Sequence, residues 1–240
     1  MIIDIVTLFP KMFEGFVAES IIKRAINNEH IKINIIDLRD FTTNKHKKVD
    51  DTPYGGNQGM VLTCQPVFDC LNKLKSNNSK TILTTPKGVT YNQKIAYDLA
   101  KEEHLIILCG HYEGFDERIM TKVDLEYSVG DYVLTGGEIP AMLIADSITR
   151  LLDGVINKES HLNDSFSNGL LEHPNYTKPA VYEGLEVPEV LINGNHKLIN
   201  EWKEKMSFIT TYQKRPDLLK DIEFSKKQLQ WIEEYKNESK

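Results

Sequence analysis

The first 152 residues alternate between short apolar runs and longer segments with helical spacing, and this alternation constrains the fold more than any other feature. In the short runs, Ile, Val and Leu predominate over a few positions, which is typical of buried strands. In the longer segments, apolar residues recur every three or four positions, which indicates helices. Strands that alternate with helices predict an α/β domain with a largely parallel sheet.

The spacing also predicts where each element lies. Strands are predicted at Ile2 to Phe9, Ile31 to Asp37, Lys80 to Thr84, His104 to Cys109, Leu125 to Val129 and Tyr132 to Leu134. Helices are predicted at Met12 to Asn27, Val61 to Ser76, Asn92 to Glu103 and Ile139 to Leu152, with one or two helical turns within Gly114 to Thr121. The polar stretch from Thr42 to Gly59 is long for a connector, and such loops tend to be functional or disordered.

The composition changes after Asp153, where Gly154 to Asn175 is polar. We therefore predict an α/β domain over residues 1–157, a flexible interdomain linker over residues 158–175 and a small helical domain over residues 176–240. A helix from Lys197 to Tyr212 should end before Arg215-Pro216, because a proline disfavours helical backbone in the residue before it. A second helix should start at Ser225, which forms a capping box with Gln228, and should bury Leu229 and Ile232.

The formal net charge of −6 argues against a nucleic-acid partner, because phosphate contacts usually need a basic surface. Basic residues nevertheless gather in the KHKK segment, from Lys45 to Lys48, and at Lys214-Arg215. These clusters could contact RNA or could be solvated loops, and charge alone leaves both readings open. If RNA is the partner, the candidate contacts are Lys45, Lys47, Lys48 and Arg215.

The chain shows no sign of export or membrane insertion. No stretch approaches the roughly 18 apolar residues that a membrane helix needs. The N-terminus lacks the basic start and apolar core of a signal peptide. The three cysteines have no CxxC spacing, and we expect them to pack as small apolar side chains. We therefore expect a cytoplasmic protein.

Three glycine-bearing loops follow predicted strands. They are Thr84 to Gly88 (TTPKG), Cys109 to Gly114 (CGHYEG) and Val129 to Glu138 (VGDYVLTGGE). Ligands of open α/β sheets bind outside the carboxyl ends of the strands, and glycines there let the backbone approach a ligand closely. Each loop alone could be a plain tight turn, but the three together predict a pocket for one compact organic cofactor.

The chain lacks the sequence motifs of several other kinds of active site. The chain contains no GxxxxGK[ST], no GxGxxG after a strand, no HExxH and no GxSxG. The sequence therefore does not support a nucleoside triphosphate site, a dinucleotide site, a zinc site or a serine hydrolase triad, and we expect no protein-held metal centre. His111 is the one histidine in a glycine loop that could act as a base, although loop position alone favours a histidine that only hydrogen-bonds the backbone.

Six segments carry a resemblance that extends over nearly the whole chain. They are TLFP (residues 7–10), RDF (39–41), VDDTPYGGNQGM (49–60), CGHYEGFDER (109–118), VGDYVLTGGE (129–138) and DSFSNGLLEHPNYTKP (164–179). In this order they closely resemble the bacterial tRNA (guanine-N1) methyltransferases, which modify the guanine at tRNA position 37. The chain departs from the family at Asn57 and Gln58, where glycine and a small residue or proline are common, and at His111, where some members have arginine.

The resemblance implies a SPOUT-type α/β fold with a deep trefoil knot, a small helical C-terminal domain that binds tRNA, and a homodimer. Knots are rare exceptions to the usual topology rules. In the family, the knot loops bind S-adenosylmethionine. By motif match, the cofactor-binding residues are Thr84, Pro86, Gly110, Tyr112, Val129, Gly130, Tyr132, Leu134, Gly136, Gly137 and Pro140.

The resemblance also implies three catalytic residues. Asp164 matches the general base, Arg150 matches the catalytic arginine, and Glu113 matches a glutamate near the methyl group and a proposed magnesium ion. Guanine N1 carries a proton, which must leave before its lone pair can attack the sulfonium methyl. A carboxylate can take that proton, and an arginine can stabilise the charge that develops on O6.

Alternative interpretations remain open at this point. From the residues alone, Asp164 could be a helix N-cap, and Arg150 could serve the dipole at a helix end. A ribose 2′-O methyltransferase of the same knotted class would not require Asp164. A non-catalytic RNA-binding protein that kept the fold would not need the donor at all.

Overall fold

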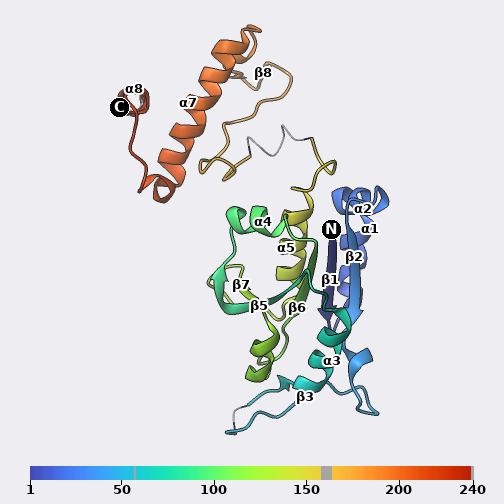
Figure 1. The fold of residues 1–240 in the computed structure, drawn as a ribbon. Helices are drawn as coiled ribbons and strands as arrows, with labels where there is room; N and C mark the ends of the chain where they lie inside the picture. The colour runs from blue at the N-terminus through green and yellow to red at the C-terminus, as the bar shows by residue number, and fades with distance from the viewer. Residues whose placement is uncertain (57, 158–163, 239–240) are drawn as a thin grey trace. The chain divides into compact units, whose positions relative to one another are not determined.

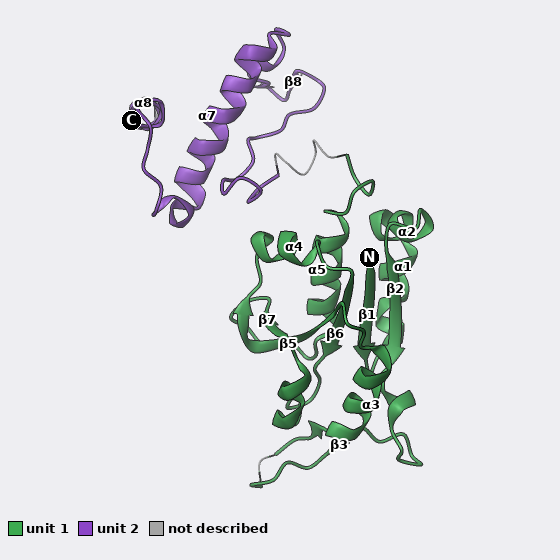
Figure 2. Ribbon diagram, in the orientation of Figure 1, with its two compact units in different colours: residues 1–157 green, residues 158–240 purple. Residues whose placement is uncertain are grey.

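The computed structural model describes residues 1–56, 58–157 and 164–238, and it divides the chain into two compact units. Unit 1 spans Met1–Asn157 and unit 2 spans Lys158–Lys240 (Figure 2). Asn57 and the first part of the predicted linker, residues 158–163, lie outside the described residues. No helix in the described part of the chain is both long and apolar enough to cross a membrane.

Unit 1 is built on a five-stranded parallel sheet with the order β2-β1-β6-β5-β7 (Figure 1). In chain order its strands are β1 (Ile2–Thr7), β2 (Lys32–Asp37), β5 (Ser79–Thr90), β6 (His104–Cys109) and β7 (Leu125–Ser128). The short strands β3 (Asp50–Asp51) and β4 (Val61–Leu62) form a separate antiparallel pair. The prediction of an α/β fold with a mostly parallel sheet is therefore confirmed.

Side chains of the central strands alternate between two apolar layers. Leu105, Ile107 and Cys109 of β6 point into one layer, while Ile106 and Leu108 point into the other. The first layer packs under α5 (Glu138–Thr149), α2 (Ser20–Asn27) and α4 (Gln93–Leu99). The second packs under α3 (Cys64–Leu74). Burial on both faces explains why β6 is an uninterrupted apolar run.

Three predicted elements of unit 1 are corrected by the structure. The helix predicted from Met12 to Asn27 is broken into a 3₁₀ turn (Pro10–Phe13), α1 (Glu14–Ala18) and α2, because Ser20 has a φ of 55°. The helix predicted from Val61 starts only at Cys64, since Val61–Leu62 is β4. No strand forms at Tyr132 to Leu134, which lies in an irregular loop. The trefoil knot stays a prediction.

Unit 2 contains α7 (His196–Lys214), α8 (Lys226–Glu238) and a hairpin of β8 (Val181–Tyr182) and β9 (Leu185–Glu186). Its core consists of Phe208, Ile209, Leu219, Trp231 and Ile232. The capping box of α8 is confirmed, because the Ser225 and Gln228 side chains each bond the other residue's backbone N–H. Leu229 was predicted to be buried but is 50% exposed, and Trp231 takes the core position instead.

Part of the segment predicted as a linker packs within unit 2. The backbone N–H of Leu171 donates to the Thr211 hydroxyl of α7 at 2.8 Å, and the Ser207 hydroxyl donates to the Leu171 carbonyl at 2.5 Å. Leu170 packs against the core of unit 2. Residues 170 and 171 are therefore held against α7.

Candidate active site

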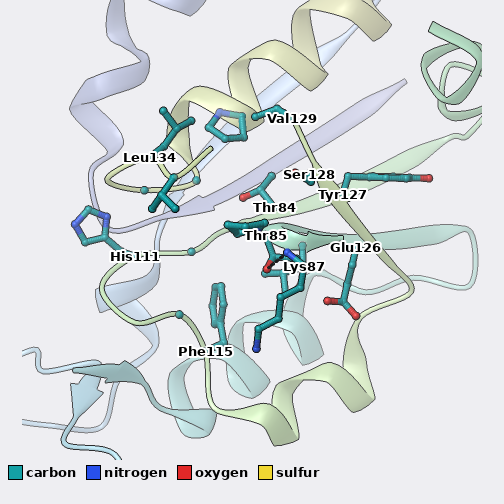
Figure 3. Close-up of a pocket in the computed structure, with 18 of the residues that line it drawn as sticks. Thr84, Thr85, Lys87, His111, Phe115, Glu126, Tyr127, Ser128, Val129 and Leu134 are labelled. Carbon is teal, nitrogen blue, oxygen red and sulfur yellow. Dashed lines mark hydrogen bonds between the residues drawn. The ribbon is translucent and has the colours of Figure 1, made fainter. Parts of the chain in front are cut away.

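The three predicted glycine loops meet around one pocket at the carboxyl edge of the parallel sheet (Figure 3). The pocket has a volume of about 380 Å³ and lies where β5, β6 and β7 deliver their loops. All eleven residues expected to bind the cofactor line it, and so does Glu113. This edge of an open α/β sheet is the usual position of a ligand site.

The first loop is an excursion from β5. Thr84 and Val89 both pair with Tyr127 of β7, so the four residues between them leave the ladder, and three of them, Thr85, Pro86 and Lys87, line the pocket. The strand predicted to end at Thr84 therefore resumes after the turn and continues to Thr90. A Cβ on Gly88 would lie 2.5 Å from the Tyr127 backbone nitrogen, so only glycine lets the loop pack this closely on β7.

The second and third loops are joined by backbone contacts. The Gly137 N–H donates to the Gly110 carbonyl at 2.7 Å, and His111 forms an isolated antiparallel bridge with Gly136. A Cβ on Gly137 would lie 2.7 Å from the Gly110 nitrogen and 2.8 Å from the Cys109 Cα. Close approach of the start of α5 to the end of β6 therefore depends on glycine at position 137.

Glu138 is a buried carboxylate at the edge of this pocket that the sequence did not single out. Its side chain is 2% exposed, and it accepts a hydrogen bond from the Thr7 hydroxyl at 2.8 Å. Its Oε2 lies 3.9 Å from Nδ1 of His111, a buried nitrogen without a hydrogen-bond partner among the described residues. Glu138 also sits in the first turn of α5, where the helix dipole favours a negative charge.

The nearby Cys109 is not suited to nucleophilic chemistry. Burial above all, and then the charge of Glu138, raise the pKa of the Cys109 thiol well above its usual range. A thiol that stays protonated is a poor nucleophile, because the thiolate is the reactive form. Cys109 is therefore a packing residue, as the sequence predicts, and Cys70 is likewise buried.

Glu113 lies in the second loop beside the glycine-rich segment. Its backbone N–H donates to the Met60 carbonyl at 3.0 Å, and a Cβ on Gly59 would meet the Glu113 side chain. The structure thus brings Gly59 and Met60, at the end of the VDDTPYGGNQGM segment, beside the pocket residue Glu113. Within the described residues, no group of three His, Cys, Asp or Glu side chains could hold a metal ion.

The two other expected catalytic residues lie outside this pocket. Arg150 follows the last turn of α5, while the pocket lies at the first turn of that helix. Twelve helical residues separate the two ends by about 18 Å. Asp164 belongs to unit 2, and its carbonyl accepts the Ser167 N–H at 3.1 Å.

The candidate RNA-contacting residues lie at the surface, and three of them pair with local carboxylates. Lys47 lies 3.2 Å from Asp40, and Lys48 lies 3.4 Å from Asp51. Arg215 in unit 2 makes a two-pronged pair with Asp217 and stands over the Phe166 ring. Surface pairs of this kind are weak, so they leave these cations free to exchange partners. Lys45 is exposed.

The pocket and sheet together define an α/β protein with a pocket of the size of a small-molecule site outside its strand ends. The family model described as tRNA (guanine-1)-methyltransferase TrmD matches residues 1–221. The tRNA (guanine-N(1)-)-methyltransferase of Bacillus subtilis strain 168 is 54% identical over 243 residues, covering 99% of this chain and 100% of the relative. That of Latilactobacillus sakei strain 23K is 51% identical, covering 100% and 99%.

The chain belongs to the tRNA (guanine-1)-methyltransferase family. It is therefore an enzyme that transfers a methyl group to a tRNA guanine, as the resemblance implied. The two alternative interpretations, a ribose 2′-O methyltransferase and a non-catalytic RNA-binding protein, lose their support with this match.

Proposed function

We propose that this enzyme takes its methyl group from S-adenosylmethionine bound in the pocket of unit 1 and delivers it to N1 of the guanine at tRNA position 37. The observation that carries this proposal is the convergence of all eleven predicted cofactor residues on one pocket. Ten of these residues come from three loops that are separate in the sequence and Pro140 comes from the first turn of α5, and the match was made from motifs alone.

The pocket suits S-adenosylmethionine in size and chemistry. Its volume of about 380 Å³ falls within the range of roughly 300–1,000 Å³ that is usual for small-molecule sites. Val129, Leu134 and Pro140 supply apolar surface, and the glycines at 110, 136 and 137 let a ligand approach the backbone closely. When bound, the donor supplies a methyl group that its sulfonium already activates, so the protein needs no nucleophile of its own.

In this proposal, the residues of the chain orient the guanine and move one proton. Asp164 accepts the proton from guanine N1, which frees the lone pair that attacks the methyl carbon. Arg150 donates to guanine O6, where negative charge accumulates as the proton leaves. Both roles rest on the family match of Asp164 in the DSF motif (residues 164–166) and of Arg150 in the DSITR motif (residues 146–150).

We also propose that the enzyme works as a homodimer in the cytoplasm, where its tRNA substrate is found. Arg150 stands about 18 Å along α5 from the pocket of its own chain, which is too far for it to reach a guanine bound there. In a homodimer, Arg150 of one copy would instead act on the guanine bound at the pocket of the other copy. Light scattering at micromolar concentration should give twice 27.5 kDa, and a clean monomer would refute the dimer.

The described residues support a bound magnesium ion less than they support the methyl donor. Mg²⁺ is usually bound through one or two carboxylates together with substrate phosphates and water. Glu113 offers one carboxylate, and the described residues around it do not complete a set of three potential ligands. Within the described residues, a magnesium ion would therefore depend on Glu113 together with substrate phosphates and water, and no step of the proposed reaction passes through the ion.

The experiment that tests the proposed function is methyl transfer from labelled S-adenosylmethionine to an unmodified tRNA with guanine at position 37. An otherwise identical tRNA with adenine at this position is the matched substrate control. We expect label at N1 only with guanine. Equal labelling of the two tRNAs, or none of either, would contradict the proposal.

A further inference from the structure

The wall of the pocket is divided into a backbone-rich end and a charged end. In Figure 3, Val129 and Leu134 lie at one end, and Lys87, Glu126 and Phe115 lie toward the other. The loop at the first end offers glycine backbone and apolar side chains. The exposed ionic side chains of Lys87 and Glu126 lie at the second end, and Glu113 and Glu117 also line the pocket.

Lys87 differs from the other ionic side chains at this end of the pocket in its charge. It is the one lysine or arginine among the described residues that line the pocket. It makes no ion pair with any described residue, although three glutamates line the same pocket. An ammonium group without a carboxylate partner is available to an anionic group of a ligand.

The backbone that carries Lys87 is fixed. Residues 85–88 form the excursion from β5, and Gly88 packs so closely that a Cβ would lie 2.5 Å from both the Glu126 carbonyl carbon and the Tyr127 nitrogen. The Lys87 N–H also donates to the Thr85 hydroxyl at 3.3 Å. The lysine stem therefore starts from a defined point on the pocket wall, and Figure 3 shows its ammonium end directed away from Thr84.

We propose that Lys87 binds the α-carboxylate of the methyl donor's amino-acid end, which makes it a specificity residue for the donor. The inference rests on the proposed use of S-adenosylmethionine. That molecule joins a neutral nucleoside to a zwitterionic amino acid, and the two ends of the pocket match this division. With the carboxylate at Lys87, the carboxylate of Glu126 at the same end of the pocket is available to the α-ammonium.

The test compares two donors that differ in one group. Decarboxylated S-adenosylmethionine keeps the adenosine, the sulfonium and the amine but lacks the carboxylate. Calorimetry with the full-length wild-type enzyme and with Lys87→Met gives four dissociation constants. We expect Lys87→Met to weaken binding of S-adenosylmethionine about tenfold and to change binding of the decarboxylated donor less than twofold, because one charge-assisted contact is removed.

Two further variants sharpen the test. Lys87→Arg keeps the positive charge and should retain most of the preference for the carboxylate. Lys94→Met removes the same charge from α4, outside the pocket, and should leave all affinities unchanged. An equal loss for both donors in Lys87→Met, or no loss for either, would overturn the inference. Wild-type enzyme that binds neither donor would instead overturn the proposed cofactor, and the inference with it.

Discussion

The two units of this enzyme differ in how firmly they hold the residues assigned to the reaction. In unit 1, the pocket is attached to a parallel sheet with an apolar layer on each face, and its loops are joined by the Gly137–Gly110 hydrogen bond. In unit 2, a much smaller core lies between α7 and α8, and the proposed base Asp164 lies in a bend outside any helix or strand.

This difference suggests that the two units serve different steps of the reaction. Unit 1 can present the proposed donor pocket by itself, since every residue that lines the pocket belongs to it. The proposed proton acceptor comes from unit 2. Donor binding and methyl transfer should therefore respond separately to mutation, and four experiments test how far this separation holds.

The largest effect is expected from Asp164→Asn. An amide cannot accept the guanine N1 proton, and positioned general bases contribute about 10²- to 10⁴-fold to rates. Methyl transfer to tRNA should fall by that factor, while the affinity for S-adenosylmethionine measured by calorimetry should not change. Asp221→Asn removes the same charge elsewhere in unit 2 and is the control. Full activity in Asp164→Asn would remove Asp164 from the mechanism.

The second experiment compares the two cores. Phe208 is 1% exposed in unit 2, and Ile107 is fully buried in unit 1. Phe208→Ala should cost about 3–5 kcal/mol and Ile107→Ala about 2–5 kcal/mol of unfolding free energy. We expect Phe208→Ala to lower the melting transition of unit 2 alone, with donor binding retained, and Ile107→Ala to lower that of unit 1.

Calorimetric melting of both variants distinguishes independent units from a single cooperative one. One transition that shifts equally in the two proteins would show that the units unfold together, and the two cores would then not be independent. Leu229→Ala is the control for α8, because this side chain is half exposed and its truncation should cost little.

These contrasts also explain which features the sequence could predict. The strand His104–Cys109 was predicted with its observed bounds, because a strand buried on both faces is apolar throughout. The break in the helix after Met12 was missed, since the apolar spacing continues through Ser20 while the backbone there does not. Local sequence patterns therefore predict well which residues are buried, but they predict breaks in the backbone poorly.

Long-range contacts set the remaining limit on prediction. Glu138 is charged, so composition would place it at the surface, yet it is buried and bonded to Thr7, which lies 131 residues away. The proposed cofactor residues were predicted from family motifs, because each glycine loop alone is also an ordinary turn. Leu229 and Trp231 lie only two positions apart on α8, and only the packing against α7 decides which of them enters the core.

The third experiment disturbs the donor pocket and leaves unit 2 intact. In Gly137→Ala, the new methyl group would lie 2.7 Å from the Gly110 nitrogen and 2.8 Å from the Cys109 Cα, so the start of α5 must move away from β6. Overpacking of this kind typically costs about 1–3 kcal/mol. We expect weaker S-adenosylmethionine binding by calorimetry and a lower melting temperature of unit 1.

Gly15→Ala is the matched control for Gly137→Ala. Gly15 lies in α1, and a Cβ there would meet no atom within 4 Å. The same substitution should therefore leave donor binding unchanged and stabilise the protein by about 0.4–1 kcal/mol, through the lower entropy of the unfolded chain. Equal effects of the two alanines would show that close packing at position 137 does not shape the pocket.

The smallest effect is expected from the basic loop of unit 1. Replacing Lys45, Lys47 and Lys48 by glutamine should weaken tRNA binding and reduce its dependence on salt, by about 0.7–0.9 in slope for each phosphate that a lysine no longer neutralises. The ion pairs of Lys47 with Asp40 and of Lys48 with Asp51 are exposed, so they compete only weakly with phosphate. The control replaces Lys80, Lys94 and Lys101, of which Lys80 and Lys101 likewise pair with carboxylates. If both triple variants show the same salt dependence, the loop does not bind phosphate specifically, and tRNA binding would have to be assigned to other surfaces of the enzyme.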